Sequence, residues 1–227
     1  MTTPKQIERI ESGVRGLDEL IEGGLLAGGV NILAGGPGTG KTIFASQFAF
    51  SAASKQGKKV IYATFEESAE YFRRNMKMFG MDFAPLEREG MIKILDVDAL
   101  RGKELESNIS LMLAALEEMG GSILIIDSLT ALLIACETTF EMRSFMKTVY
   151  RSVKNRDITT LMTVGTSQSG QLGPETFLAD SVIMLENWLD DFELKTRFIV
   201  LKMRGTDHSR KYHSVMISSE GMNISKF

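Results

Sequence analysis

The sequence predicts an α/β fold in which helices cover both faces of a mostly parallel sheet, with antiparallel strands added near the C-terminus. Apolar, β-branched runs alternate with helical stretches between residues 30 and 164, as parallel strands joined by crossover helices do. After Asp180 the helical pattern stops, and short strand-like runs follow one another across polar turns. A chain of 227 residues can bury the core of one such domain, which we expect to span 1–227.

Short apolar runs predict the parallel strands, and amphipathic spacing predicts the helices between them. The expected strands lie near residues 30–34, 59–65, 91–96, 122–127 and 158–164. The expected helices lie near residues 41–54, 68–79, 104–119 and 137–155. Beyond them, 181–186 and 196–203 should pair across the turn Asp190-Asp191, and short strands at 212–217 and 222–225 should flank Glu220-Gly221.

Residues 35–42 (GGPGTGKT) match the phosphate-binding pattern G-x-x-x-x-G-K-[ST] and lie between an expected strand and an expected helix. Glycines let the backbone wrap an anion with its N–H groups, and the start of the next helix adds a positive dipole. Lys41 is predicted to reach the β- and γ-phosphates of a nucleoside triphosphate, and Thr42 to bind Mg²⁺. The residues expected to bind nucleotide here are Gly36, Pro37, Gly38, Thr39, Gly40, Lys41, Thr42 and Ile43.

The composition excludes several other classes of protein. Cys136 is the single cysteine, so no disulfide forms within the chain. Lys and Arg number 26 against 29 Asp and Glu, and the net charge of −3 gives no overall attraction to nucleic acid. No apolar run approaches the roughly 20 residues that cross a bilayer, and residues 1–11 are polar, unlike a secretion signal. We therefore expect a cytoplasmic protein with no membrane partner.

Acidic residues stand at the ends of two expected strands. Asp127 closes the strand 122–127 and should emerge at the carboxyl edge of the sheet, where open α/β sheets bind ligands. It is predicted to hold the water shell of Mg²⁺, although an aspartate there can also cap the next helix. Glu66 and Glu67 follow the strand 59–65 and are candidates for the base that orients attacking water. The alternative is that the two carboxylates only interact favourably with the positive start of the next helix. The spacing does not say which of the two faces the water.

Lys202 and Arg204 end a nearly all-apolar strand at positions i and i+2, so in an extended chain their side chains point to the same face. Such a pair suits a phosphate. Basic strand ends also occur for solubility alone, and spacing supports both interpretations equally.

Several segments together resemble the KaiC-like branch of the RecA superfamily of ATPases. They are 16–24 (GLDELIEGG), the phosphate loop, 64–67 (TFEE) and 202–208 (KMRGTDH). The similarity spans nearly the whole chain, and the tandem glutamates and the K-x-R-G-T-x-H strand end are far more specific than the phosphate loop. It implies a RecA-type core that binds ATP with Mg²⁺ and assembles into a hexameric ring with ATP between neighbouring subunits.

The resemblance also implies roles for individual residues. Glu66 matches the family's catalytic base, and Glu67 its companion glutamate. The residues that match those offered to the neighbour's γ-phosphate, or lying alongside them, are Lys202, Arg204, Thr206 and His208. Phe79 matches a position beside the nucleotide.

The sequence also departs from the clock proteins of this family, which carry two such domains in tandem. Thr176-Phe177 falls where their second domain has a phosphorylated Ser-Thr pair, so protein kinase activity is not expected. The sequence ends at Phe227, and no extended regulatory tail is expected. We therefore expect an ATPase with a regulatory or signalling role and an unknown protein partner, but not a clock.

The main alternative is a DNA-binding recombination or repair ATPase of the RecA or RadA kind, which shares the core and the ATP site. Its DNA-contacting loops should carry cations, yet the corresponding stretches 128–140 and 165–180 contain no lysine or arginine. A basic helix does occur, but its spacing predicts a solvated face over a core face; its cations are Arg143, Lys147, Arg151, Lys154 and Arg156. Nucleic acid is thus not an expected partner. A switch with slow turnover stays open, because an ATPase site does not reveal what it drives.

Overall fold

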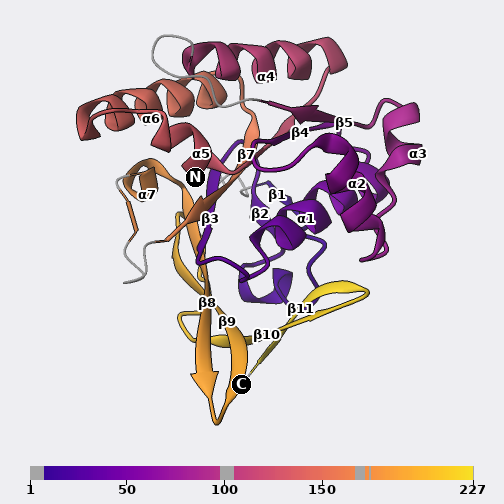
Figure 1. Ribbon diagram of the computed structural model, residues 1–227, viewed down its shortest axis with the longest axis vertical. Helices are drawn as coiled ribbons and strands as arrows, with labels where there is room; N and C mark the ends of the chain where they lie inside the picture. Colours follow the sequence, from indigo (N-terminus) through magenta and orange to yellow (C-terminus); the bar gives the residue numbers. More distant parts are fainter. Residues whose placement is uncertain (1–7, 98–104, 167–171, 174, 227) are drawn as a thin grey trace, which may run out of the picture.

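A computed structural model describes residues 8–97, 105–166, 172–173 and 175–226 of the chain. Nine strands of this described part form one sheet, in the order β11-β10-β9-β8-β3-β7-β6-β4-β5 (Figure 1). Its parallel strands are β3 (Val30–Gly35), β4 (Val60–Thr64), β5 (Ile92–Asp96), β6 (Ile123–Asp127), β7 (Thr159–Gly165) and β8 (Ser181–Asp190). Its antiparallel strands are β9 (Glu193–Met203), β10 (His213–Ser218) and β11 (Gly221–Lys226). The predicted fold class is confirmed.

Helices cover both faces of the sheet, as predicted. One face carries α1 (Lys41–Lys55), α2 (Ala69–Lys77) and α3 (Phe83–Arg88), and the other carries α4 (Leu105–Met119), α5 (Leu129–Ile134) and α6 (Thr139–Lys154) (Figure 1). Phe44 of α1 and Phe72 of α2 pack in the first core with Tyr62 of β4, whereas the neighbouring Ile61 packs in the second core. Successive residues of a parallel strand therefore face opposite cores, which explains the continuous apolar runs in the sequence.

Several short elements escape the sequence analysis. They are α3, α5, α7 (Glu175–Leu178), the 3₁₀ helix Asp18–Leu20 and a small sheet of β1 (Arg9–Ile10) and β2 (Leu25–Leu26). An element of one or two turns is too short for its apolar period to be recognised. Helix α3 does carry a local signal, because the Asp82 side chain caps it by accepting a hydrogen bond from the Ala84 N–H. Residue 104, the predicted start of α4, lies outside the described residues.

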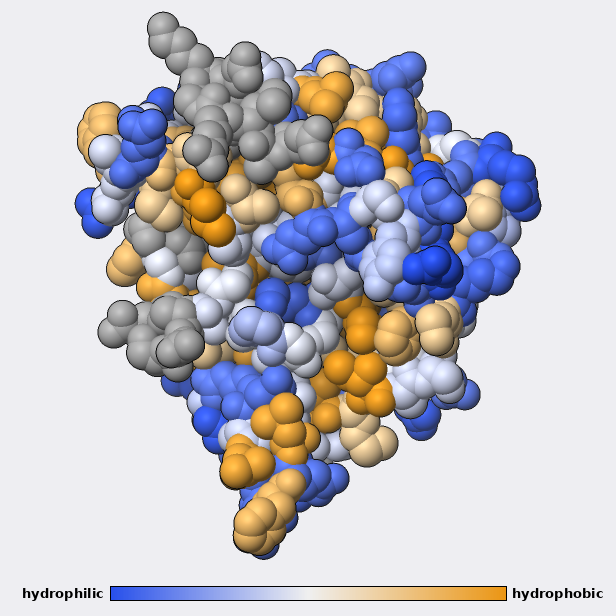
Figure 2. All heavy atoms as spheres, viewed as in Figure 1, coloured by the Kyte–Doolittle hydropathy of each residue, from blue (hydrophilic) through white to orange (hydrophobic). Residues whose placement is uncertain are grey.

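β8 and β9 form a longer hairpin than the predicted pair. Their pairing continues out to Asp190 and Glu193, and Asp191 and Phe192 make the turn with positive φ angles of 43° and 70°. Apolar side chains gather at this tip, where Phe192 is fully exposed, at 100% (Figure 2). None of residues 186–197 in the outer part of the hairpin is buried, so burial leaves no alternating pattern there for the sequence to reveal.

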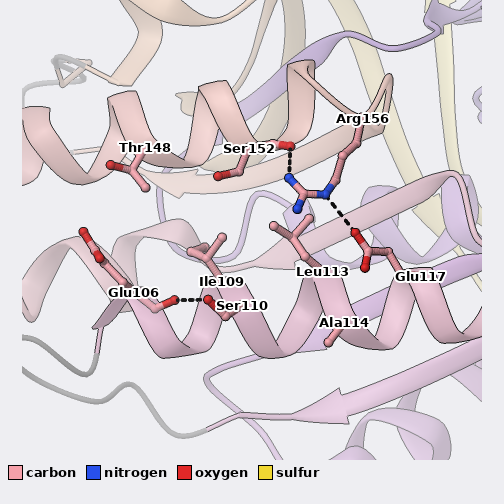
Figure 3. A pocket seen from close by; sticks show the side chains of 9 residues that line it. All are labelled: Glu106, Ile109, Ser110, Leu113, Ala114, Glu117, Thr148, Ser152 and Arg156. Carbon is pink, nitrogen blue, oxygen red and sulfur yellow. Dashed lines mark hydrogen bonds and ion pairs between the residues drawn. The ribbon is translucent and has the colours of Figure 1, made fainter.

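α4 and α6 lie side by side and leave a groove of about 270 Å³ between them (Figure 3). Arg156 spans one end, where its Nε donates to Glu117 of α4 at 2.9 Å and its NH1 donates to the Ser152 carbonyl at 3.2 Å. The basic helix has the predicted core face, formed by Phe145, Met146, Val149 and Val153. Within the described ranges, no helix combines the length and apolarity that crossing a bilayer demands.

Lys154 corrects one detail of that prediction. It was expected on the solvated face of α6, but its side chain is only 31% exposed and its Nζ lies 2.7 Å from the Asp180 carboxylate. The same Nζ donates to the Gly28 carbonyl at 2.8 Å. A buried carboxylate at the start of β8 thus draws the lysine inward, because an unpaired buried charge would be costly.

Candidate nucleotide-binding site

The phosphate loop, residues 36–40, joins the end of β3 to the start of α1. Gly38 and Gly40 have φ angles of 73° and 90°, a left-handed conformation that residues with a Cβ rarely adopt. At Gly40 a Cβ would also lie 2.6 Å from Cδ1 of Ile217 in β10. Inside the loop, Oγ1 of buried Thr39 donates to the Gly36 carbonyl at 2.9 Å. Gly38 and Gly40 are therefore required by the shape of the loop.

The start of α1 suits an anion. Its first turn has neither an acidic residue nor a side-chain cap, so its N–H groups are not covered by a side chain. Lys41 reaches back across the loop, and its Nζ donates to the Gly36 carbonyl at 3.0 Å. Burial lowers the pKa of the Lys41 ammonium, while Asp127 and Glu66 oppose that shift. The lysine therefore lies close to two of the predicted acidic residues.

Asp127 is buried at the end of β6 and is held by neighbours on both sides. Tyr62 of β4 donates its hydroxyl to Oδ2 at 2.8 Å, and Thr163 of β7 donates to Oδ1 at 2.5 Å. Burial, with Asp127 as a secondary cause, raises the pKa of the Tyr62 hydroxyl well above its usual value. The alternative role as a helix cap does not apply, because Ser128 occupies the N-cap position of α5.

Glu66 and Glu67 follow β4 at the same edge of the sheet but have different surroundings. Glu66 is exposed, and its Oε1 accepts a hydrogen bond of 2.5 Å from the Ser128 hydroxyl. Glu67 is half-buried and accepts a hydrogen bond from Asn75 of α2 at 3.3 Å. Burial, and then the negative charge of Asp127, raises the pKa of the Glu67 carboxyl. The structure thus brings both glutamates, Asp127 and Lys41 together beside the phosphate loop.

A pocket of about 450 Å³ opens beside the start of α1. The start of α1, Glu67 after β4, and the end of α2 with the two residues that follow it form its walls. The lining residues are Thr42, Ile43, Glu67, Asn75, Met76, Met78 and Phe79. Phe79 and Ile43, both predicted to lie beside the nucleotide, are therefore in one pocket next to Thr42. In the sequence, Met76 and Met78 give no sign of lining a pocket, since methionines near a helix end usually fill the core.

Lys202 and Arg204 lie at the opposite edge of the sheet from the phosphate loop. β9 is antiparallel to β8, which pairs in parallel with β3, and the register places Met203 opposite Ser181 and Ser181 opposite Asn31. The cations therefore lie level with the start of β3, whereas the phosphate loop follows its last residue. Five strand residues separate these levels, a distance of about 16 Å along β3.

The two cations are side by side in one groove. A pocket of about 530 Å³ is lined by the end of β9 and the segment after it, including Lys202, Arg204, His208 and Arg210. A β-bulge interrupts the pairing of β8 and β9 next to Lys202, and bulges commonly re-aim side chains near functional sites. Lys202 Nζ donates to the Phe177 carbonyl at 3.2 Å, and burial, followed by Arg204, lowers its pKa.

The residues around the two cations differ from the prediction at Thr206 and Arg210. The Thr206 hydroxyl accepts a hydrogen bond from Arg9 at 2.9 Å and is not among the residues that line the groove. Arg210 does line the groove, although it was not predicted to. The only sign of this in the sequence is that Arg210 lies two residues after His208. The sequence analysis also misses Tyr62, Thr163 and Ser128, whose hydroxyls fix the acidic residues; in the sequence they are ordinary strand and cap residues.

Comparison with known proteins agrees with this geometry. Residues 10–226 match the family described as "ATPase: KaiC". The chain is 32% identical to UPF0273 protein MJ1359 of Methanocaldococcus jannaschii, with 96% of each covered. It is 31% identical to the circadian clock protein KaiC3 of Synechocystis, covering 96% of this chain but 46% of that protein.

The fold is also similar to that of a solved structure. The crystal structure of KaiC-like protein PH0186 from Pyrococcus horikoshii has a TM-score of 0.88 and 32% identity, and the match covers 96% of this chain and 99% of that one. The family match spans both the phosphate loop and the cationic end of β9. The chain therefore belongs to the KaiC family of ATPases.

Proposed function

We propose that this protein binds ATP with Mg²⁺ at the phosphate loop and hydrolyses it. The observation that carries the proposal is the group of Lys41, Asp127 and Glu66 at the carboxyl edge of the sheet, beside the free start of α1. Phosphoryl transfer requires little covalent chemistry from the protein, but it requires positive groups around the phosphates and an oriented water. The loop and Lys41 supply the first, and a glutamate supplies the second.

The donor set fits magnesium bound together with a nucleotide. Among the described residues, no group of three or more His, Cys, Asp or Glu side chains is placed to hold a metal ion. Thr42 offers a hydroxyl oxygen, and Asp127 keeps free lone pairs on both oxygens after accepting from Tyr62 and Thr163. Mg²⁺ takes few protein ligands and fills its shell with phosphate oxygens and water, and when bound it would neutralise phosphate charge.

Glu66 is the better candidate for the base. It is exposed, where water can reach it, and the Ser128 hydroxyl fixes one of its oxygens and leaves the other free. Glu67 lies deeper, bound to Asn75, and lines the apolar pocket that we assign to the base of the nucleotide, with Ile43 and Phe79 as its neighbours. Glu67 would therefore support the site from the side.

The position of Lys202 and Arg204 supports an active site shared between subunits. About 16 Å of strand separates their level from the start of the phosphate loop, which exceeds the length of an arginine side chain, so they cannot serve the loop of their own subunit. A closed head-to-tail ring would bring this edge of one subunit against the phosphate loop of the next. We assign Lys202 and Arg204 to the neighbour's γ-phosphate, with His208 alongside, in a hexameric ring.

We assign the whole of 1–227 to one domain with a regulatory role in the cytoplasm, acting on a protein partner. Similarity to a circadian clock protein supports the regulatory role. The exposed cations of α6 face solvent beside its apolar core face, so DNA binding is not proposed. Residues 167–171 and 174, within one of the two stretches compared with DNA-binding loops, lie outside the described residues.

Lys41→Ala should weaken ATP binding at least about tenfold, because it removes a charged hydrogen bond to phosphate. It should also abolish turnover, since the same contact is made in the transition state. Titration with a fluorescent ATP analogue measures the first effect, and phosphate release measures the second. Lys55→Ala, at the far end of the same helix, is the matched control. Unchanged affinity in a folded Lys41→Ala protein would contradict the assignment.

Ser128→Ala should slow hydrolysis about tenfold with ATP affinity unchanged, because it removes the hydrogen bond that orients Glu66. Ser128→Thr keeps the hydroxyl and should restore much of the rate. Single-turnover hydrolysis with saturating ATP is the measurement. If both variants hydrolyse at the wild-type rate, this hydrogen bond does not orient the base.

A further inference from the structure

We propose that Asp180 is a positioning residue that holds Arg204 for action on the ATP of a neighbouring subunit. This inference rests on the proposed function, in which Arg204 acts on the neighbour. Asp180 directly precedes β8, lies two residues beyond the end of α7, and is only 6% exposed. In the sequence alone, Asp180 marks only the point where the helical pattern ends.

Asp180 connects three elements through both its backbone and its side chain. Its Oδ1 lies 3.1 Å from NH1 of Arg204, and its carbonyl accepts the Arg204 N–H at 2.9 Å. Its Oδ2 pairs with Lys154 of α6 at 2.7 Å and accepts the Val30 N–H at 2.8 Å. Arg204 is therefore fixed to Asp180 at two points, just where β9 ends and the chain leaves the sheet.

The exposure of the two side chains fits positioning rather than burial. The Asp180 side chain is 9% exposed, whereas that of Arg204 is 52% exposed. A guanidinium has five N–H donors, so an anchor at NH1 leaves most of them available to a phosphate. Lys154 neutralises the same carboxylate from the other side, so the carboxylate keeps a partner when the guanidinium faces an anion. Holding a catalytic cation in advance lowers the entropy lost when the neighbour's site is completed.

A purely structural role makes a different prediction. Through Val30, Asp180 also supports β3, which leads to the phosphate loop. Damage through that route would impair the subunit's own ATP site, whereas loss of the Arg204 anchor would impair the neighbour's site. Mixed assemblies can separate these two routes.

The test uses Asp180→Asn, which keeps the size and the acceptor for Val30 but removes the charge. Alone, it should bind the fluorescent ATP analogue like the wild type and hydrolyse ATP at least about tenfold more slowly. Mixed with Lys41→Ala, it should regain activity, because it supplies intact phosphate loops; mixed with Arg204→Ala, it should not. Asp180→Asn combined with Arg204→Ala in one chain should be no slower than Arg204→Ala alone. Asp191→Asn at the hairpin tip is the matched control.

The other possible results contradict either the positioning role of Asp180 or the shared site on which it rests. Wild-type hydrolysis by Asp180→Asn, or recovery with Arg204→Ala instead of Lys41→Ala, overturns the positioning role and leaves the proposed function intact. If Lys41→Ala and Arg204→Ala also fail to recover with each other, the shared site itself is wrong. Should Asp180→Asn fail to fold, Asp180→Glu keeps the charge, displaces the carboxylate by one methylene and should show the same pattern of recovery; the reverse pattern would again overturn the proposal.

Discussion

Glu66→Gln should bind ATP normally and hydrolyse it about 10²-fold more slowly or worse, the range expected when a general base is removed. The substitution keeps the size of the side chain and an acceptor for the Ser128 hydroxyl, so the local hydrogen bond survives while the charge is lost. Binding should persist because, in the proposed function, Lys41 and the loop contact the phosphates and Glu66 does not. Single-turnover hydrolysis at saturating ATP, beside a titration of affinity, separates the two effects.

Glu67→Gln is the matched control, one residue away. Its side chain contacts Asn75 and is half-buried, so neutralising it should change the rate far less than neutralising Glu66. The raised pKa of Glu67 also makes it the poorer permanent anion, since its carboxyl takes up a proton at a higher pH than usual. If hydrolysis survives in Glu66→Gln and collapses in Glu67→Gln, the two roles are reversed.

Mixing Lys41→Ala with Arg204→Ala should restore ATP hydrolysis although neither protein is active alone. A competent interface needs the phosphate loop of an Arg204→Ala subunit beside the arginine of a Lys41→Ala subunit. At equal amounts and random exchange, about a quarter of the interfaces in a head-to-tail ring meet this condition. Phosphate release should therefore rise toward about a quarter of the wild-type rate as subunits exchange.

The same mixture prepared without exchange, from chemically cross-linked parents, should stay inactive. Light scattering with and without ATP establishes whether rings form and whether the mixed species have the same size. Verified mixed rings without recovery, or a dilute wild-type monomer as active as the ring, would show that Arg204 does not act on a neighbour.

Sequence reasoning succeeded where one rule of the fold decides the position. In a parallel sheet the carboxyl ends of the strands share one edge, so residues at or just after the ends of 30–34, 59–65 and 122–127 had to meet there. That rule predicts that Lys41, Asp127 and Glu66 lie near one another, as they do in the structure. Helix and strand positions followed similarly from long apolar periods.

The remainder depends on register, which periodicity does not encode. Arg204 lies level with the start of β3, away from the phosphate loop, because β9 runs antiparallel to β8. The bulge beside Lys202 also affects how the end of β9 is placed. Asp180 looked like a boundary residue, because its two cationic partners lie 26 and 24 residues away in the chain. A one-residue slip would change those partners while leaving the composition and pattern of the sequence the same.

The contacts behind the phosphate loop also bear on the order in which the chain is made. Gly40 packs against Ile217, and the Gln47 side chain hydrogen-bonds to the backbone of Met222, 175 residues further on. A ribosome therefore synthesises the loop early, long before the strands that support it from behind have emerged. Contacts between residues so far apart in the sequence form slowly, so the support behind the phosphate loop is complete only after β10 and β11 have been made.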